Sequence, residues 1–203
     1  LIHEQNAFPG MANKWLGKIA TKVVVSFKES KKFFPKKKTE VTGNMIHKNL
    51  CQPRENFAPP SKQPFKILIL GGSQGAHSIN LGIIEALDFL SDRKNNLHIT
   101  HQTGEADYKY IKNQYCEKGF DANVMSFITD MHLQYRLASL VICRSGATTI
   151  AEITAAGRVS ALIPFPYAAN NHQEHNARII ETANAGEVIL DSEISGERLA
   201  KSI

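Results

Sequence analysis

The sequence predicts an α/β fold in which a parallel sheet is covered by helices on both faces. After Lys66, short apolar runs alternate with segments of helical periodicity, and strands that alternate with helices pair in parallel. Two junctions between a strand and the next helix are turns built from glycine and small polar residues, at 71–76 and 145–147. Ligands of parallel sheets bind beyond the carboxyl ends of the strands, where both turns are expected.

The predicted elements follow one another closely after Lys66. The apolar run 64–70 is too short for a helix and is typical of a buried parallel strand. The same reasoning gives strands at 66–70, 97–102, 122–127, 139–143, 159–163 and near 187–190, and helices at 76–90, 105–118, 130–138, 147–156 and 173–184.

The chain before Lys66 is organised differently. Residues 1–45 predict an amphipathic helix near Ala12–Thr21, a strand at 23–27 and turns as far as Asn44. Residues 46–65 carry four prolines and little periodicity, which indicates a linker. A chain of 203 residues has room for one full domain and part of another.

The first turn, Gly71-Gly72-Ser73-Gln74-Gly75-Ala76, directly follows a predicted strand. Glycines let the backbone approach a ligand closely, and Ser73 and Gln74 add hydrogen-bond donors. The spacing is neither the dinucleotide fingerprint nor the P-loop. Because glycine is also common in such turns for steric reasons, this turn alone is weak evidence for a ligand.

The second turn, Ser145-Gly146, opens a helix at Ala147 whose free N–H groups would bind phosphate. Thr148 and Glu152 share one helix face, and a carboxylate there is well placed to accept hydrogen bonds from two ribose hydroxyls. The alternative is a plain strand-turn-helix with Ser145 as the N-cap and a solvated glutamate. Together, the two turns favour a nucleotide site.

The loop 164–176 is unusually polar and is expected at the same edge of the sheet. Its amides, such as Gln173 and Asn176, can recognise sugar hydroxyls. His172 and His175 raise the alternative of a metal site, but they lack the HExxH pattern and an obvious carboxylate partner. A helix-capping loop is the structural alternative, and we expect no metal.

Charge is concentrated in one short segment. Residues 28–38 hold six lysines and one glutamate, equal to the net charge of +5 of the whole chain. Interleaved with aromatic residues, they suit an anionic membrane surface, nucleic acid or a solvated loop. The three cysteines form no CxxC pair, so no zinc site is expected. No apolar run approaches the roughly 18–20 residues of a membrane span.

These motifs occur together, in order, in one known family. They are His3-Glu4-Gln5-Asn6 with Pro9-Gly10, Gly71–Ala76, Phe127–Met131, Cys143–Ala147, Glu152 with Ala155–Gly157, Pro164–Pro166, and His172-Gln173 with Asn176-Ala177. Over nearly its whole length the chain resembles the MurG family, the N-acetylglucosaminyltransferases of glycosyltransferase family 28. The resemblance implies a GT-B fold: a doubly wound, Rossmann-like C-terminal UDP-sugar domain at 66–203, a linker at 46–65, and at 1–45 the tail of the N-terminal acceptor-side domain.

The resemblance also implies the residues of a UDP-N-acetylglucosamine site. They are Asn6 on the first domain's side, Ser73 at the diphosphate, Ile128 at the uracil, Gln173 at the sugar hydroxyls, and Ala147, Thr148, Thr149, Ile150, Ala151 and Glu152 at the phosphates and ribose.

The implied reaction is an inverting, metal-independent transfer of N-acetylglucosamine to undecaprenyl-diphospho-muramoyl-pentapeptide in peptidoglycan synthesis, with no cofactor. The resemblance places His3 and Glu4 near the reaction, but we assign no catalytic base. It implies a peripheral enzyme at the cytoplasmic face of the bacterial inner membrane, so the partner of the lysines is expected to be an anionic membrane surface and not nucleic acid.

Two features depart from the family pattern. His47 stands where the family usually has an arginine, and a mostly neutral imidazole cannot replace the charged fork of a guanidinium. Most of the first domain is missing, so we expect the chain to be a piece of a longer one. Two alternatives therefore stay open: a catalytically silent UDP-sugar-binding fragment that needs a separate N-terminal domain, and another GT-B glycolipid synthase.

Overall fold

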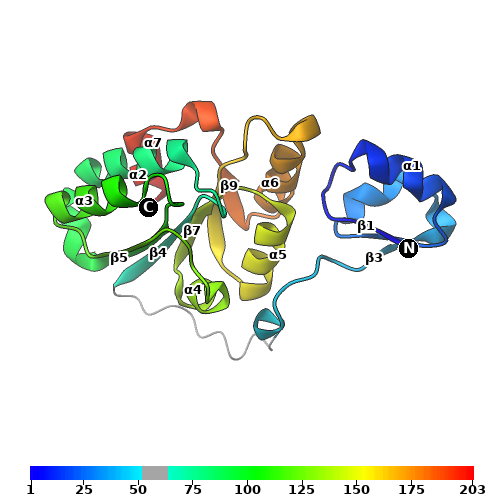
Figure 1. The fold of residues 1–203 in the computed structure, drawn as a ribbon, viewed down its shortest axis with the longest axis horizontal. Coiled ribbons are helices and arrows are strands. Elements are labelled where there is room, and N and C mark those ends of the chain that lie inside the picture. Colours follow the sequence, from blue (N-terminus) through cyan, green and yellow to red (C-terminus); the bar gives the residue numbers. More distant parts are fainter. Residues whose placement is uncertain (52–63) are drawn as a thin grey trace.

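The computed structural model describes residues 1–51 and 64–203, and these form two parallel sheets (Figure 1). The larger sheet has the strand order β6-β5-β4-β7-β8-β9, and all neighbouring strands run parallel. Its strands are β4 (Phe65–Leu70), β5 (Leu97–Gln102), β6 (Ala122–Met125), β7 (Leu140–Cys143), β8 (Val159–Leu162) and β9 (Gly186–Val188).

Helices cover both faces of this sheet, which confirms the doubly wound α/β fold. The connecting helices are α2 (His77–Phe89), α3 (Tyr108–Lys118), α4 (Met131–Leu137), α5 (Ala147–Ala156) and α6 (His172–Thr182), and α7 (Gly196–Ser202) packs on α2. If these six strands are numbered by their order in the chain, their order across the sheet is 3-2-1-4-5-6. The winding direction therefore reverses between β4 and β7.

The core forms two layers because side chains alternate along each strand. Ile67 and Ile69 of β4 join one cluster with residues of α2, α3 and α7. Leu68 and Leu70 of the same strand join a second cluster with residues of α4, α5 and α6. Each face of the sheet is therefore covered by its own set of helices.

The smaller sheet has the order β1-β2-β3, with β1 (Ile2–Glu4), β2 (Val23–Val25) and β3 (Thr39–Val41). Helix α1 (Met11–Ile19) connects β1 to β2, and Val23, Val25 and Phe34 form the core. The predicted helix and the strand at 23–27 are both present, within a few residues. β1 and β3 were not predicted, since three residues each show no measurable alternation.

Other boundaries differ from the sequence prediction by local turns. The helix expected at 105–118 begins at Tyr108, because residues 105–107 form a turn, and the strand expected at 122–127 ends at Met125. Helix α7 was not predicted, and its buried Leu199 packs into the core beside α2.

Part of the predicted linker packs on the larger unit. Residues 48–50 form one turn of 3-10 helix, and Leu50, which is buried, joins the core cluster of α4, α5 and α6. Residues 52–63 of the predicted linker lie outside the described residues.

A buried polar chain ties α2 to β5 and α3. The His101 ring bonds to the Tyr115 hydroxyl at 3.0 Å and to Asn80 Oδ1 at 3.0 Å. Asn80 Nδ2 donates to the Thr103 carbonyl at 2.9 Å and to Asp107 at 2.7 Å. Burial lowers the pKa of His101 from 6.5 to about 3, so the imidazole is neutral in the folded protein.

This histidine predicts a loss of stability in acid. Below pH 6.5 the unfolded chain binds a proton at His101 that the folded chain excludes until pH 3. The free energy of unfolding therefore falls with decreasing pH, by up to about 1.4 kcal/mol per pH unit in this window. Urea unfolding at pH 7.5 and 5.0 measures the loss, and in His101→Gln we expect it to be smaller by about 2 kcal/mol.

The half-buried His172 provides the control. His172→Gln is expected to keep the pH dependence of the natural sequence. An equal loss in His101→Gln would show that the acid sensitivity comes from other groups.

Candidate functional site

A cavity of about 1,050 Å³ opens at the carboxyl ends of β4, β5 and β7. Leu70 at the end of β4 pairs with Cys143 at the end of β7. The two glycine turns follow these residues, so both line the same cavity, where the winding of the sheet reverses. This is the place where open α/β sheets bind their ligands.

The first turn is folded tightly against the rest of the sheet. A Cβ atom on Gly71 would lie 2.2 Å from the Ala76 nitrogen. Gly75 has φ +81°, and its Cβ would lie 2.1 Å from the Thr103 carbonyl oxygen. Side chains are excluded at both positions, so backbone shapes this wall of the cavity.

The second turn leaves the N-terminus of α5 without a side-chain cap among the described residues. The N-cap is Gly146, and the buried Ser145 instead donates its hydroxyl to the Gln173 carbonyl at 2.8 Å. The alternative of an N-capping Ser145 is therefore wrong. The N–H groups of the first helical turn are available to an anion, aided by the helix dipole.

Glu152 lines the cavity one turn further along α5 and hydrogen bonds to the buried Tyr135. Burial raises the pKa of Glu152, and the Tyr135 hydroxyl and nearby His47 partly oppose this shift. Tyr135 therefore positions the carboxylate. His47 stacks on His132 with ring centroids 4.9 Å apart, so a pair of imidazoles stands beside Glu152 where a family arginine is expected.

Gln102 connects two walls of the cavity, and the sequence analysis did not select it. Its Nε2 group donates to the Gly72 carbonyl at 2.8 Å, and its Oε1 atom accepts from the Ile128 N–H at 2.9 Å. Gln102 is 2% exposed. One buried amide thus fixes the first glycine turn and the loop at Ile128 relative to each other. Its position at the end of a predicted strand was the signal that could have found it.

Arg144 was also missed as a functional candidate. Its guanidinium donates to Asp191, to the Ser78 hydroxyl at 2.9 Å and to the Pro164 carbonyl at 3.1 Å. Ser78 in turn donates to Asp191 at 2.9 Å. Arg144 therefore ties the second turn to the start of α2 and to the loop after β8, which shapes the floor of the cavity.

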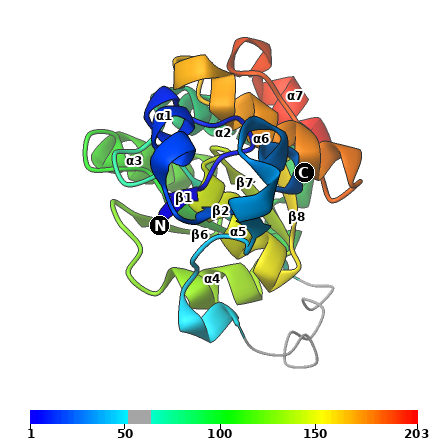
Figure 2. The same cartoon turned by 90° about the vertical axis from the view of Figure 1, so that its right-hand side faces the viewer.

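A buried asparagine joins the two units beside this cavity. Asn176 of α6 accepts from the Ala7 N–H at 2.8 Å and donates to Asn6 Oδ1 at 3.1 Å and to the Ser145 carbonyl at 3.3 Å. Phe8 stacks on His175 with centroids 5.3 Å apart. The loop after β1 therefore lies against α6, as Figures 1 and 2 show.

Glu4 organises the loop that carries Asn6. The carboxylate is 2% exposed and accepts from Asn6 N at 2.9 Å, Gly10 N at 3.2 Å and Asn13 Nδ2 at 2.8 Å. His3 pairs with Ser26 Oγ at 3.1 Å. Neither side chain lines the cavity, so this geometry favours a structural role for both.

The expected site residues divide into two groups. The residues that line the cavity are Ser73, Ile128, Thr148, Thr149, Glu152 and Gln173, and those that do not are Asn6, Ala147, Ile150 and Ala151. Ile150 packs into the core and its N–H bonds to the Gly146 carbonyl, so it supports the helix. The Oε1 atom of Gln173 accepts from the Phe165 N–H at 3.0 Å, which orients its amide.

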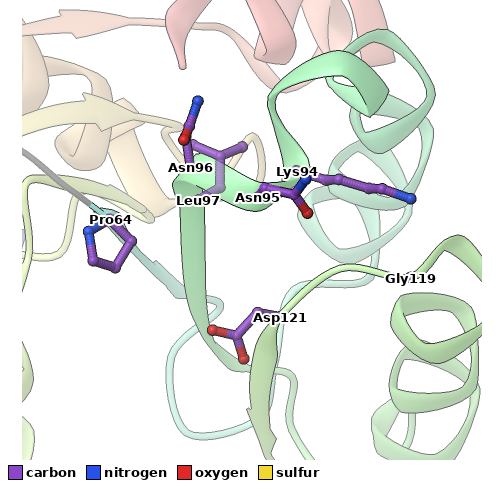
Figure 3. A pocket seen from close by; sticks show the side chains of 7 residues that line it. All are labelled: Pro64, Lys94, Asn95, Asn96, Leu97, Gly119 and Asp121. Atoms are coloured by element: carbon purple, nitrogen blue, oxygen red, sulfur yellow. The ribbon is translucent and has the colours of Figure 1, made fainter.

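Over residues 1–51 and 64–203, no group of three or more His, Cys, Asp and Glu side chains could hold a metal. A hollow of about 500 Å³ near Pro64, Leu97 and Asp121 lies at the amino ends of strands β4 to β6 (Figure 3). The two glycine turns lie at the opposite ends of these strands.

The sheet order, the two glycine turns and the cavity between them define the Rossmann-like domain of a GT-B glycosyltransferase. Residues 66–203 match the glycosyltransferase family 28 C-terminal domain. The chain belongs to glycosyltransferase family 28.

Two curated relatives and one solved structure show what the chain is similar to. The chain is 48% identical over 202 residues to a UDP-N-acetylglucosamine--N-acetylmuramyl-(pentapeptide) pyrophosphoryl-undecaprenol N-acetylglucosamine transferase of Citrifermentans bemidjiense, covering 100% of this chain and 56% of that protein. A protein of the same name from Thermodesulfovibrio yellowstonii is 48% identical over 207 residues, covering 100% of this chain and 57% of that protein. The crystal structure of Acinetobacter baumannii MurG has a TM-score of 0.80 at 32% identity, covering 98% and 56% of the two chains. This chain thus spans about half the length of the curated relatives it matches.

The two bonds of Gln102 predict different effects of two substitutions. Gln102→Glu keeps an acceptor for the Ile128 N–H, whereas Gln102→Met removes it. A net hydrogen bond contributes about 1 kcal/mol, so we expect the Ile128 amide to exchange about 5-fold faster in Gln102→Met and near the natural rate in Gln102→Glu. Gln102→Met also loses the donor to Gly72, so exchange at 72–75 should rise in that variant. Amide hydrogen exchange followed by NMR measures these rates, and equal acceleration at Ile128 in both variants would contradict the bridge.

Proposed function

We propose that this chain is the donor-binding half of an enzyme that transfers N-acetylglucosamine from UDP-N-acetylglucosamine to undecaprenyl-diphospho-muramoyl-pentapeptide, forming lipid II from lipid I. The transfer inverts the anomeric centre and uses no metal or cofactor. The chain spans about half the length of the relatives whose names state this transfer.

One observation carries the proposal. Glu152 and the N-terminus of α5 line a single cavity together with the first glycine turn, at the reversal point of the sheet. A diphosphate at the helix N-terminus would leave its attached ribose one helical turn away, beside the Glu152 carboxylate. The same substrates appear in the names of the relatives at 48% identity.

The residues of this chain would act mainly on the leaving group. As the acceptor 4-hydroxyl attacks the anomeric carbon, the bond to the diphosphate breaks and negative charge grows on UDP. The N–H groups of the first turn of α5 and the backbone of the 71–76 turn are placed to stabilise that charge. The attacking hydroxyl must lose a proton to a base, and we assign this role to no residue of the chain.

Calorimetric titration of UDP-N-acetylglucosamine into this chain, with a chelator present, tests the donor site. We expect saturable binding that Glu152→Ala weakens about 10- to 100-fold, since hydrogen bonds to a carboxylate contribute about 1.5–3 kcal/mol. Burial raises the pKa of Glu152, so the affinity should fall on acidification at a higher pH than for an ordinary carboxyl. Glu152→Gln should lack this dependence.

A control variant tests the specificity of the effect of Glu152→Ala, and further outcomes separate the alternatives. Glu105→Ala removes an exposed carboxylate outside the cavity and should leave the affinity unchanged. Tighter binding of UDP-N-acetylgalactosamine would favour another GT-B glycolipid synthase. Transfer that appears only after a separate N-terminal domain is added would identify a binding fragment, and no binding of either sugar nucleotide would refute the proposed donor site.

We further propose that residues 11–38 meet an anionic membrane surface, at the cytoplasmic face of a bacterial inner membrane. Met11, Trp15 and Ile19, which are 64–82% exposed, form an apolar stripe at helical spacing on α1. Lys38 donates to the Lys18 and Ala20 carbonyls at 2.8 Å, which holds the lysine-rich segment at the end of α1. An apolar stripe beside a basic cluster suits a headgroup layer. No helix of the described ranges is long and apolar enough to cross a membrane.

Sedimentation with lipid vesicles tests this surface. Each lysine near an anionic layer contributes about 1 kcal/mol, so replacing Lys36 and Lys37 with Gln should weaken binding to phosphatidylglycerol vesicles about 25-fold. Lys109→Gln changes an exposed lysine of α3, in the unit of the larger sheet, and should leave vesicle binding unchanged. Undiminished binding of the double variant, or equal binding to neutral phosphatidylcholine vesicles, would contradict the proposal.

A further inference from the structure

A second cavity is lined by two residues whose side chains each have a buried polar atom without a hydrogen-bond partner among the described residues. Among the described residues, two buried side-chain atoms have no hydrogen-bond partner, Arg158 Nε and Ser160 Oγ. Arg158 is 8% exposed and Ser160 is 3% exposed. Both residues line the same cavity of about 300 Å³.

This cavity is separate from the nucleotide cavity. It lies between the C-terminal ends of α5 and α6 at the start of β8, and the two cavities share no lining residue. The amino end of β8 is the opposite end of the sheet from the glycine turns. A ligand here would therefore not be part of the sugar-nucleotide site.

Arg158 gives the cavity lining one positive charge, and most of the other lining residues are apolar. Apart from Arg158, Ser160 and Thr154, the lining residues are apolar or glycine, and they include Ile150, Ile153, Leu162 and Ile180. No aspartate or glutamate lines the cavity. Arg136 adds a second positive charge nearby, and burial together with Arg136 lowers the pKa of Arg158.

An N–H group that is buried without an acceptor, as Arg158 Nε is, is unfavourable because it has lost water and gained no partner. In native proteins such groups usually pair with a carboxylate, a bound ion or water. Here the described chain provides no carboxylate, while the isoleucine and leucine walls favour an apolar body over a small hydrated ion. A volume of about 300 Å³ is at the lower end of small-molecule sites.

We propose that this cavity binds a monocarboxylate with a short aliphatic chain. Arg158 would pair with the carboxylate through its planar fork of donors, and Ser160 would donate its hydroxyl to the same group. The aliphatic chain would pack among Ile150, Ile153 and Ile180. The inference does not depend on which sugar nucleotide the other cavity takes.

Titration of octanoate, followed by the methyl NMR signals of Ile150, Ile153 and Ile180, tests the proposal. We expect saturable shifts with the natural sequence and at least 10-fold weaker binding with Arg158→Met. Ser160→Ala should weaken binding less, about 2- to 5-fold. Octanol, which has the same chain without the charge, should bind weakly and equally to the natural protein and to Arg158→Met.

Two further measurements separate a binding role from a structural one. Arg158→Met should not lower the melting temperature without ligand, and octanoate should raise it only in the natural sequence. Shifts that inorganic phosphate reproduces would indicate an adventitious ion only and overturn the proposal. No saturable shift with octanoate, equal binding by Arg158→Met, or a melting temperature that falls with Arg158→Met would also overturn it.

Discussion

The parallel pairing of β4 with β7 is the constraint on which the rest of the site depends. Leu70 and Cys143 are in register, so the two glycine turns leave the sheet side by side. This holds although the turns begin at Gly71 and Ser145, far apart in the sequence. Neither turn makes a cavity alone. Together they form one because the winding of the sheet reverses between these two strands, and the helices that follow lie on opposite faces.

Buried amides then hold the backbone of the site in place. Gln102 joins the first turn to the loop at Ile128, and Asn176 joins the second turn to the loop after β1. An amide carries both donors and an acceptor, so it can satisfy two backbone segments at once without a buried charge. Leaving either partner unpaired would be unfavourable, so Gln102, which lines the cavity, and Asn176, which does not, both help to fix its shape.

The two cavities differ in how many of their polar side chains already have hydrogen-bond partners within the described residues. Around the first cavity, polar side chains such as Arg144 already have partners, and the uncapped N-terminus of α5 and Glu152 are among the groups that line it. At the far end of α5, the unpaired Nε atom of Arg158 and Oγ atom of Ser160 lie in a cavity lined mainly by apolar side chains. Helix α5 therefore separates the proposed phosphate site from the proposed carboxylate site.

The sequence by itself determined the larger fold, the two turns and the role expected of Glu152, because apolar periodicity and glycine placement are local signals. It failed for β1 and β3, which are three residues long, and for α7, whose Leu199 is buried only because α2 lies beside it. Gln102, Tyr135 and Asn176 position the site through partners 17 to 170 residues away in the sequence. Which buried side chain meets which backbone segment depends on strand order and packing, so only the tertiary structure decided how the site is held together.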